Sequence, residues 1–240
     1  MLGAALNSVA GGGGFIAFPA LLFIGVPAIA ANATQTVALW CGVTASSRAY
    51  RQHLDVPRRI LIPLVVTSLI GGLGGAFLLL HTPQHTFLHL VPWLMLSATL
   101  LFALSPLVTG RRSGVAHDAS TIAVIGASIF ELVVAVYGGY FGGGLGIMNL
   151  AMLATLGMTE IHAMNALKAV LGSVINGVAV LTFIAARAVY WKQALVMIAG
   201  SLVGGYFGAH YAQKVPKTLV RGFVIAIGAT MTVYFFLKPA

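Results

Sequence analysis

The sequence predicts an all-α polytopic membrane protein with about eight transmembrane segments in two tandem homologous repeats, each containing one glycine-broken helix. Composition is the first reason, because the 240-residue chain is 59% hydrophobic and only 7% charged, whereas a soluble domain carries about 25% charged residues. Several apolar runs also reach the roughly 20 residues that cross a hydrocarbon core. The third reason is a glycine-rich pattern that occurs twice.

Eight apolar runs follow one another along the chain, at residues 2–24, 28–47, 59–80, 88–109, 119–138, 160–185, 191–211 and 218–237. The fifth run continues with interruptions to residue 156, either as one long broken helix or as a helix followed by a half-helix. This ambiguity changes the number of segments from eight to nine. The first run follows no basic region and contains no cleavage site, so we expect it to span the membrane rather than to be a removable signal peptide.

The repeated pattern is GGGGFIAFPALLFIGVPAIAANATQT at residues 11–36 and GGYFGGGLGIMNLAMLATLGMTEIHAMNALK at residues 138–168. An offset of about 132 residues aligns three pairs, which are Gly14 with Gly146, Gly25 with Gly157, and Thr36 with Lys168. The offset shifts by one further along the chain. We therefore expect a first repeat at residues 1–110, a cytoplasmic linker at 111–118 and a second repeat at 119–240.

The distribution of Lys and Arg predicts an orientation, because cytoplasmic connectors are enriched in these residues. With eight spans, the connectors after the second, fourth and sixth segments share a side and hold Arg48, Arg51, Arg58, Arg59, Arg111, Arg112, Arg187 and Lys192. The opposite connectors hold Lys214, Lys217 and Arg221. We expect the first group and both termini to be cytoplasmic. The two halves would be parallel, or inverted if the broken helix re-enters; the sequence leaves both arrangements open.

The glycine breaks are the first candidate site. Each glycine within a helix costs roughly 0.5–1 kcal/mol relative to Ala, and a bilayer tolerates a break only where the freed backbone is buried in protein or lines a cavity. Paired breaks indicate a transporter site, and free N–H groups at a helix N-terminus attract anions. The alternative is a kink needed only for packing. We expect an anion cradle formed by Gly12, Gly13, Gly14, Gly142, Gly143 and Gly144.

Polar residues close to each break are the second set of candidates. We expect the substrate to contact Asn32, Thr34 and Thr36 in the first half, and Asn149, Asn165 and Lys168 in the second. An intramembrane lysine faces a cavity or a partner by default, so Lys168 would neutralise an anion unless it snorkels to the interface. Glu131, in the run SIFELVVAVYGG, is the candidate for proton coupling. Its alternative role is to pair with a buried base or hydroxyl.

Other function classes find little support. The net charge of +9 lies at the ends of the apolar runs without an aromatic–basic patch, so we expect no nucleic-acid partner. A single cysteine, Cys41, excludes an internal disulfide and a cysteine-based metal cluster. No catalytic motif occurs, so we expect no enzyme, cofactor or metal site. The expected partners are the lipid bilayer and a small anionic substrate, and a homo-oligomer is left open.

The run GGGGFIAFPALLFIGVPAIAANATQTVAL and its echo GGGLGIMNLAMLATLGMTEIHAMNALKAV resemble the sulfite exporter TauE/SafE family of membrane permeases. The resemblance covers nearly the whole chain. It implies a protein of the bacterial inner membrane that moves sulfite, organosulfonates or related sulfur-containing anions with an ion gradient. One departure is that Ala151 in the second copy stands where the first has Pro19, which argues against equal roles for the two halves.

These observations together predict a secondary transporter, either a permease or an exporter, for a small sulfur-containing anion coupled to the proton gradient. Two alternatives stay open. One is an uncoupled, channel-like pore for a small solute, and the other is a non-transporting intramembrane scaffold.

Overall fold

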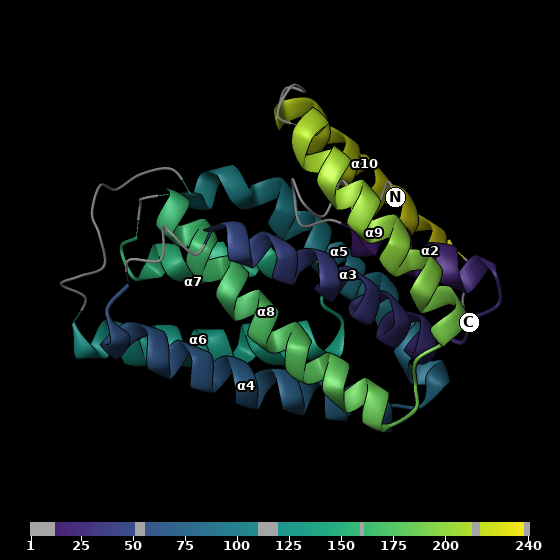
Figure 1. The fold of residues 1–240 in the computed structure, drawn as a ribbon, viewed down its shortest axis with the longest axis horizontal. Helices are drawn as coiled ribbons and strands as arrows, with labels where there is room; N and C mark the ends of the chain where they lie inside the picture. The colour runs from purple at the N-terminus through teal and green to yellow at the C-terminus, as the bar shows by residue number, and fades with distance from the viewer. Residues whose placement is uncertain (1–12, 51–55, 110–119, 159–160, 213–216, 238–240) are drawn as a thin grey trace.

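The computed structural model describes residues 13–50, 56–109, 120–158, 161–212 and 217–237, and Gly12 and the expected linker at 111–118 lie outside this part of the chain. All regular secondary structure within the described residues is helical. The helices are α2 (Gly14–Phe23), α3 (Ala28–Tyr50), α4 (Arg58–His81), α5 (Gln84–Thr109), α6 (Thr121–Tyr140), α7 (Leu145–Thr155), α8 (Ile161–Ala185), α9 (Trp191–Ala212) and α10 (Lys217–Leu237) (Figure 1). The all-helical class is therefore confirmed.

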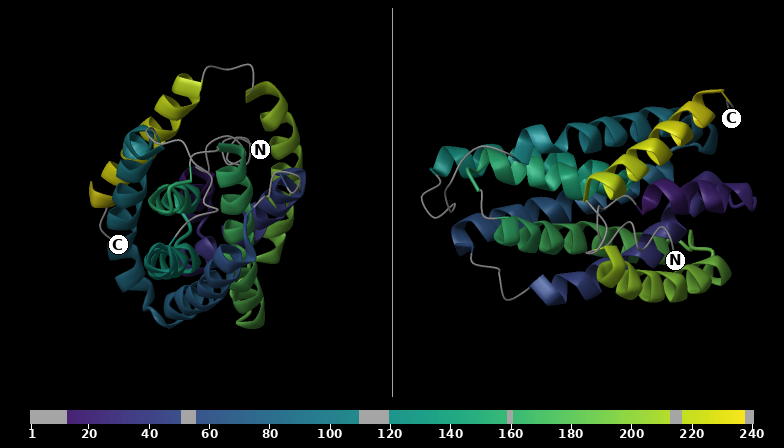
Figure 2. Two further views of the ribbon diagram at one scale, coloured as in Figure 1. Left: turned by 90° about the vertical axis from the view of Figure 1, so that its left-hand side faces the viewer. Right: turned by 90° about the horizontal axis from the view of Figure 1, so that it is seen from above.

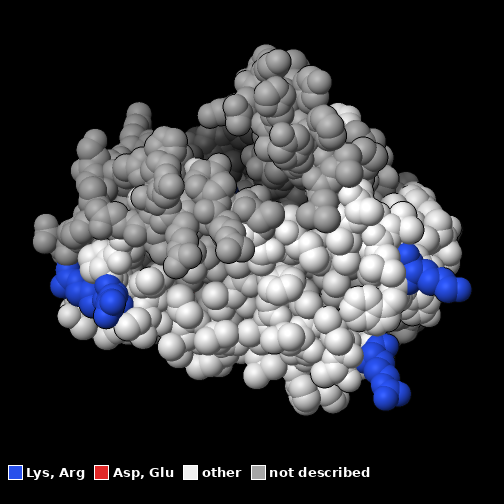
Figure 3. Space-filling model, viewed as in Figure 1, with Lys and Arg blue, Asp and Glu red and all other residues white. Residues whose placement is uncertain are grey.

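The outer surface has the character expected of a membrane protein. In the described part of the chain, α4, α6 and residues Ala163–Ala185 of α8 are long and apolar enough to cross a bilayer. Large apolar side chains on the outer faces of α4 and α6 are exposed, including Ile70, Phe77, Ile125 and Val133. An apolar surface of this extent needs lipid or another protein to cover it. Lys and Arg gather at two opposite ends of the visible face, with an uncharged surface between them (Figure 3).

Glycines bring α4 and α6 into backbone contact. A Cβ atom added to Gly71 would lie 2.8 Å from the carbonyl oxygen of Leu132, and one added to Gly75 would lie 2.8 Å from the backbone nitrogen of Tyr140. From α6, Gly139 in turn packs against the backbone of Gly72. Small residues allow this close approach of helices in lipid. The glycines at 71, 72 and 75 therefore serve the packing of α4 on α6.

The broken fifth segment forms a helical hairpin. Helix α6 begins at the Ser120 cap, whose hydroxyl accepts a hydrogen bond from the backbone nitrogen of Ala123, and it ends before a turn in which Gly142 and Gly144 both have φ of 77°. Glycine adopts this left-handed conformation without the penalty of a Cβ atom. Helix α7 then folds back along α6, because Leu145 packs on Gly138 while the far end of α7 shares an apolar cluster with the first turns of α6. The segment is thus a helix followed by a half-helix that re-enters.

A cluster of aromatic rings holds this turn against the first half of the chain. The ring centroid of Phe18, on α2, lies 6.2 Å from that of Phe87 on α5 and 6.0 Å from that of Phe141 in the turn. All three side chains are buried. Burying aromatic side chains in edge-to-face contacts stabilises a core. The two broken segments therefore meet around Phe18.

Helices α3 and α8 lie side by side and run in opposite directions (Figures 1 and 2). The hydroxyl of Thr34, near the start of α3, accepts a hydrogen bond from the backbone nitrogen of Tyr190, which follows α8. Further along, the indole nitrogen of Trp40 donates to the carbonyl oxygen of Ser173 at 3.0 Å. Helix α9 packs against α3, while α10 packs on α5 and α2. Helices α9 and α10 therefore occupy opposite flanks of the bundle (Figure 2, left).

This antiparallel pair corrects one expectation, namely that the basic connectors share a side. Arg58 and Arg59 begin α4, just after the C-terminal end of α3. Arg187 and Lys192 lie in the α8–α9 connection, which the Thr34–Tyr190 hydrogen bond places at the N-terminal end of α3. The expected grouping of all eight residues was therefore wrong. It assumed that every segment crosses the membrane, whereas α7 turns back.

Candidate functional site

The second broken segment brings Lys168 to the start of α7. A Cβ atom added to Gly146, in the first turn of α7, would lie 3.4 Å from the Cδ atom of Lys168 on α8. The ammonium group of Lys168 donates a hydrogen bond of 2.8 Å to the side-chain oxygen of Asn165, one turn earlier. An ammonium has three donors, so this bond leaves Lys168 able to bind a ligand as well.

Asn149 lies one turn after Gly146 on the same helix face, since residues three apart are neighbours on a helix surface. Its side chain is fully buried, and neither its oxygen nor its nitrogen has a hydrogen-bond partner among the described residues. A buried amide without partners costs free energy. Of the expected residues, Asn149 thus lies on α7 itself, Lys168 contacts its first turn, and Asn165 is bonded to Lys168.

The first broken segment forms a matching arrangement around Gln35, a residue absent from the expected set. A Cβ atom added to Gly14, at the start of α2, would lie 3.6 Å from the side-chain oxygen of Gln35. The side-chain nitrogen of Gln35 donates a hydrogen bond of 2.9 Å to Asn32, one turn earlier on α3. The contacts of Gln35 with Gly14 and Asn32 thus have the same form as those of Lys168 with Gly146 and Asn165.

In this geometry Gln35, and not Thr36, corresponds to Lys168. The short motif N-A-x-Q at residues 32–35 and N-A-x-K at 165–168 carries this register. The offset is 132 residues at the glycines and 133 at the motif, so one extra residue enters between Gly157 and Asn165. The motif by itself therefore pairs Gln35 with Lys168 in the sequence, whereas the offset of 132 residues set by the glycines pairs Thr36 with Lys168.

Three expected contacts in the first half use their polar groups within the protein. The side-chain nitrogen of Asn32 donates to the carbonyl oxygen of Tyr140 at 3.0 Å, which satisfies a carbonyl at the broken end of α6. The hydroxyl of Thr36 donates to the carbonyl oxygen of Asn32 at 2.7 Å. Thr34 binds the backbone nitrogen of Tyr190. These bonds give Asn32, Thr34 and Thr36 structural roles at the break and at the α8–α9 connection.

The glycine turn is held by a partly buried tyrosine. The hydroxyl of Tyr137 donates to the carbonyl oxygen of Gly143 at 2.8 Å and lies 3.2 Å from that of Leu94 on α5. Gly144 faces Ala98, because an added Cβ atom would lie 3.1 Å from the Cβ of Ala98. In the first half, Gly13 and Gly14 are placed at the start of α2. The expected glycines that the structure describes thus lie at or immediately before the starts of α2 and α7.

Glu131 is separate from both half-helix termini. Its side chain is fully buried between α6 and α4, where the hydroxyl of Ser68 donates a hydrogen bond of 2.5 Å to one carboxyl oxygen. The other oxygen has no partner among the described residues. A buried carboxyl with one free oxygen can exchange a proton. The structure therefore gives Glu131 the hydroxyl partner considered from the sequence and leaves one oxygen available.

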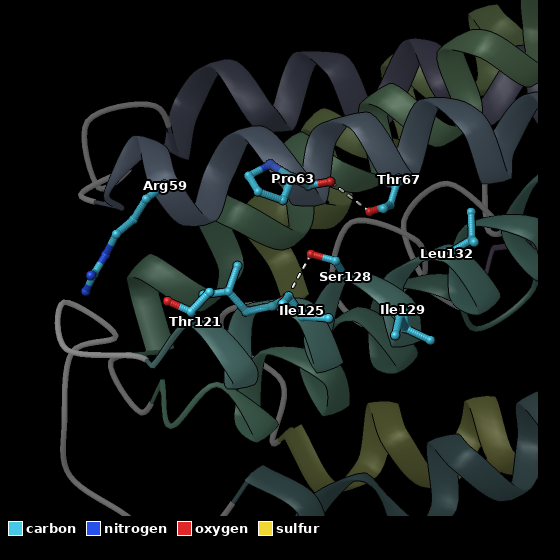
Figure 4. A pocket seen from close by; sticks show the side chains of 9 residues that line it. Arg59, Pro63, Thr67, Thr121, Ile125, Ser128, Ile129 and Leu132 are labelled. Carbon is cyan, nitrogen blue, oxygen red and sulfur yellow. Dashed lines mark hydrogen bonds between the residues drawn. The ribbon is translucent and has the colours of Figure 1, made fainter.

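A groove of about 410 Å³ lies on the outer face between α4 and α6 (Figure 4). It is lined by Arg59, Pro63, Thr67, Thr121, Val124, Ile125, Ser128, Ile129 and Leu132. The hydroxyls of Thr67 and Ser128 bond to carbonyls of their own helices. None of the expected substrate contacts lines this groove, and in the described residues no three His, Cys, Asp or Glu side chains gather to hold a metal ion.

Comparison with known proteins identifies the family of the chain. The family model described as "Sulfite exporter TauE/SafE" matches residues 1–235. The chain belongs to this family. A "Probable membrane transporter protein" of Haemophilus influenzae is 28% identical over 232 residues, covering 95% of the chain and 88% of the relative. "Probable membrane transporter protein ORF9" of a Sinorhizobium species is 25% identical, with coverage of 98% and 88%.

A third relative, "Probable membrane transporter protein YfcA" of Escherichia coli K12, is 25% identical, with coverage of 97% of the chain and 85% of the relative. No solved structure matches the chain significantly. The family and these names indicate that this TauE/SafE family member is a multi-pass membrane transporter.

Proposed function

We propose that this TauE/SafE family member is a secondary transporter, a permease or exporter, for a small sulfur-containing anion such as sulfite or an organosulfonate. The observation that carries the proposal is the contact of Lys168 with Gly146 in the first turn of α7. Lys168 lies on α8, whose residues Ala163–Ala185 are long and apolar enough to span the bilayer. A helix N-terminus and a cation together attract an anion. The neighbouring amides of Asn149 and Asn165 supply further donors.

The two halves are inverted repeats in this proposal. Helices α2 and α3 correspond to α7 and α8, and α3 and α8 run antiparallel. Left-handed Gly25 and Gly157, with φ of 84° and 78°, follow the corresponding half-helices α2 and α7. Inverted repeats with discontinuous helices support alternating access, in which one repeat moves against the other around the binding site.

The chain crosses the bacterial inner membrane with the Arg58–Arg59 end in the cytoplasm. Removing Arg187 and Lys192 from the expected basic group leaves six Lys or Arg residues in the connectors after the second and fourth segments, which still favours this side. The end of α10 lies near α2, because Tyr234 packs on Phe23. The end of α10 then lies on the side of the membrane opposite to Arg58 and Arg59. Of the expected orientation, the proposal therefore keeps only the cytoplasmic position of the connectors that contain these arginines.

Glu131 is the proton-coupling group in this proposal, because it is a buried carboxyl with one oxygen free among the described residues. It lies on α6, the helix that leads into the broken turn, and it bonds across to α4 through Ser68. A change in its protonation would alter the α4–α6 contact and thereby the position of the turn. The roles of the other expected substrate contacts stay predictions. The formation of a homo-oligomer stays open.

The experiment that tests this proposal is flux in proteoliposomes. Purified protein is reconstituted, and uptake and efflux of labelled sulfite, sulfoacetate, thiosulfate and sulfate are measured with and without a pH gradient. Coupled transport predicts flux of at least one anion that follows the gradient. Flux indifferent to the gradient would indicate an uncoupled pore, and no flux from folded protein would favour a scaffold.

A further inference from the structure

The side-chain amide of Gln35 faces the start of α2, and its oxygen is the nearer of its two polar atoms to an added Cβ atom on Gly14, at 3.6 Å against 3.9 Å for the nitrogen. The side chain of Gln35 is only 3% exposed, and its oxygen has no hydrogen-bond partner among the described residues. An unpaired buried carbonyl oxygen is costly, so its position beside the first turn of a half-helix calls for a ligand.

A chain of hydrogen bonds dictates which atom of Gln35 faces Gly14. The backbone carbonyl of Tyr140 can only accept a hydrogen bond, so Asn32 must turn its NH₂ group toward it. The oxygen of Asn32 then faces Gln35 and requires a donor, which is the NH₂ group of Gln35. The Gln35 oxygen is therefore the atom of this amide that lies nearer to the start of α2 and has no partner among the described residues, and an amide oxygen can only accept.

The Gln35 and Lys168 positions are far apart along the bundle. The Trp40–Ser173 hydrogen bond connects the antiparallel α3 and α8. Gln35 precedes Trp40 by five residues and Lys168 precedes Ser173 by five, so they lie on opposite sides of this contact. At 1.5 Å per residue their separation along the helix axes is about 15 Å. A small anion cannot touch both groups at once.

We propose that Gln35 forms a second substrate position, distinct from the Lys168 position, and that it selects substrates carrying a hydrogen-bond donor. This inference rests on the proposed transport function. Lys168 binds the anionic group, whereas the Gln35 oxygen accepts a hydrogen bond from an O–H or N–H of the same solute when it occupies the other half of the path. The first turn of α2 binds the anionic group there, because the dipole of a helix N-terminus favours negative charge. The substrate class is thus an oxyanion or sulfonate that also has a donor group.

The test compares two sulfonates of equal charge, 2-hydroxyethanesulfonate and ethanesulfonate, in proteoliposome flux. Wild-type protein is expected to transport the hydroxylated probe at least about tenfold faster, the scale of one buried hydrogen bond. Gln35→Leu is expected to abolish this preference. Gln35→Leu also leaves the oxygen of Asn32 unpaired, so Gly14→Ala provides a second variant. Its methyl group would fill the space beside the Gln35 oxygen at ordinary contact distances from the amide, which leaves the Gln35–Asn32 hydrogen bond in place.

Gly172→Ala is the matched control, because an added Cβ atom on this α8 glycine meets no atom within 4 Å. It should keep the wild-type preference. Equal flux of the two probes through wild-type protein, or an unchanged preference in folded Gln35→Leu and Gly14→Ala, would overturn the Gln35 assignment and leave the proposed transport intact. If wild-type protein moves neither probe nor any of the sulfur anions, the proposed function itself fails, and the Gln35 position fails with it.

Discussion

At the scale of single residues, the proposed anion site depends most on Lys168. Its ammonium lies beside the first turn of α7 and bonds to Asn165. Lys168→Gln keeps a donor but removes the charge, so we expect anion flux in proteoliposomes to fall about tenfold or more, since hydrogen bonds to charged groups contribute roughly 1.5–3 kcal/mol.

Lys192→Gln is the control for this substitution, because Lys192 is exposed at the start of α9. Its flux should remain within about twofold of wild type, since exposed charges contribute little. Wild-type flux in folded Lys168→Gln protein would remove Lys168 from the site.

Glu131 allows a test of coupling that leaves its packing nearly unchanged. Glu131→Gln retains an oxygen that can accept the hydrogen bond from Ser68, but the amide cannot exchange a proton. We expect flux that no longer follows an imposed pH gradient. Ser68→Ala keeps the carboxyl and should keep gradient-driven flux. Gradient dependence that persists in Glu131→Gln would show that another group carries the proton.

At the scale of elements, the α4–α6 contact depends on glycines that face α6. A Cβ atom on Gly75 would lie 2.8 Å from the backbone nitrogen of Tyr140, whereas one on Gly74 meets nothing within 4 Å. We expect Gly75→Ala to lower the free energy of unfolding by about 1–3 kcal/mol, as overpacking does. Gly74→Ala should raise it by about 0.5–1 kcal/mol through helix propensity. Thermal unfolding in detergent compares the two, and equal melting temperatures would contradict the interface.

The turn between α6 and α7 can be tested in the same way. Gly144 has φ of 77°, and an added Cβ atom would lie 3.1 Å from Ala98. A left-handed alanine costs about 1–2 kcal/mol, so we expect Gly144→Ala to displace the start of α7 and reduce anion flux several-fold. Gly126→Ala, on the open face of α6, should transport like wild type. Normal flux in Gly144→Ala would show that this turn conformation is not needed.

At the scale of the whole molecule, the direction of α8 against α3 decides which connectors share a side. The single native cysteine, Cys41, can be replaced by Ala, and Arg59→Cys and Lys192→Cys can then be made one at a time. We expect an impermeant maleimide added outside intact spheroplasts to label Lys192→Cys only, because the two positions lie at opposite ends. Labelling of both or neither would contradict the inverted arrangement.

Helix α4 shows how much of the fold was accessible from the sequence. An apolar run was expected at 59–80, and the helix extends from Arg58 to His81. The agreement is close because the thickness of the bilayer and the polar residues at each end determine the length of a spanning helix. The glycine break after α6 was also predicted, since consecutive glycines disfavour a continuous helix.

Three features depended on contacts between distant residues. The return of α7 along α6 requires the packing of Leu145 on Gly138. The contacts of Gln35 with Gly14 and of Lys168 with Gly146 join separate helices. The separation of Arg59 from Lys192 follows from the hydrogen bond between Thr34 and Tyr190. Composition and periodicity therefore determined by themselves that this chain forms apolar helices and that glycines interrupt one of them after α6. Only the tertiary structure decided the direction of each half-helix and the residues beside it, because a glycine turn allows either direction and packing selects one.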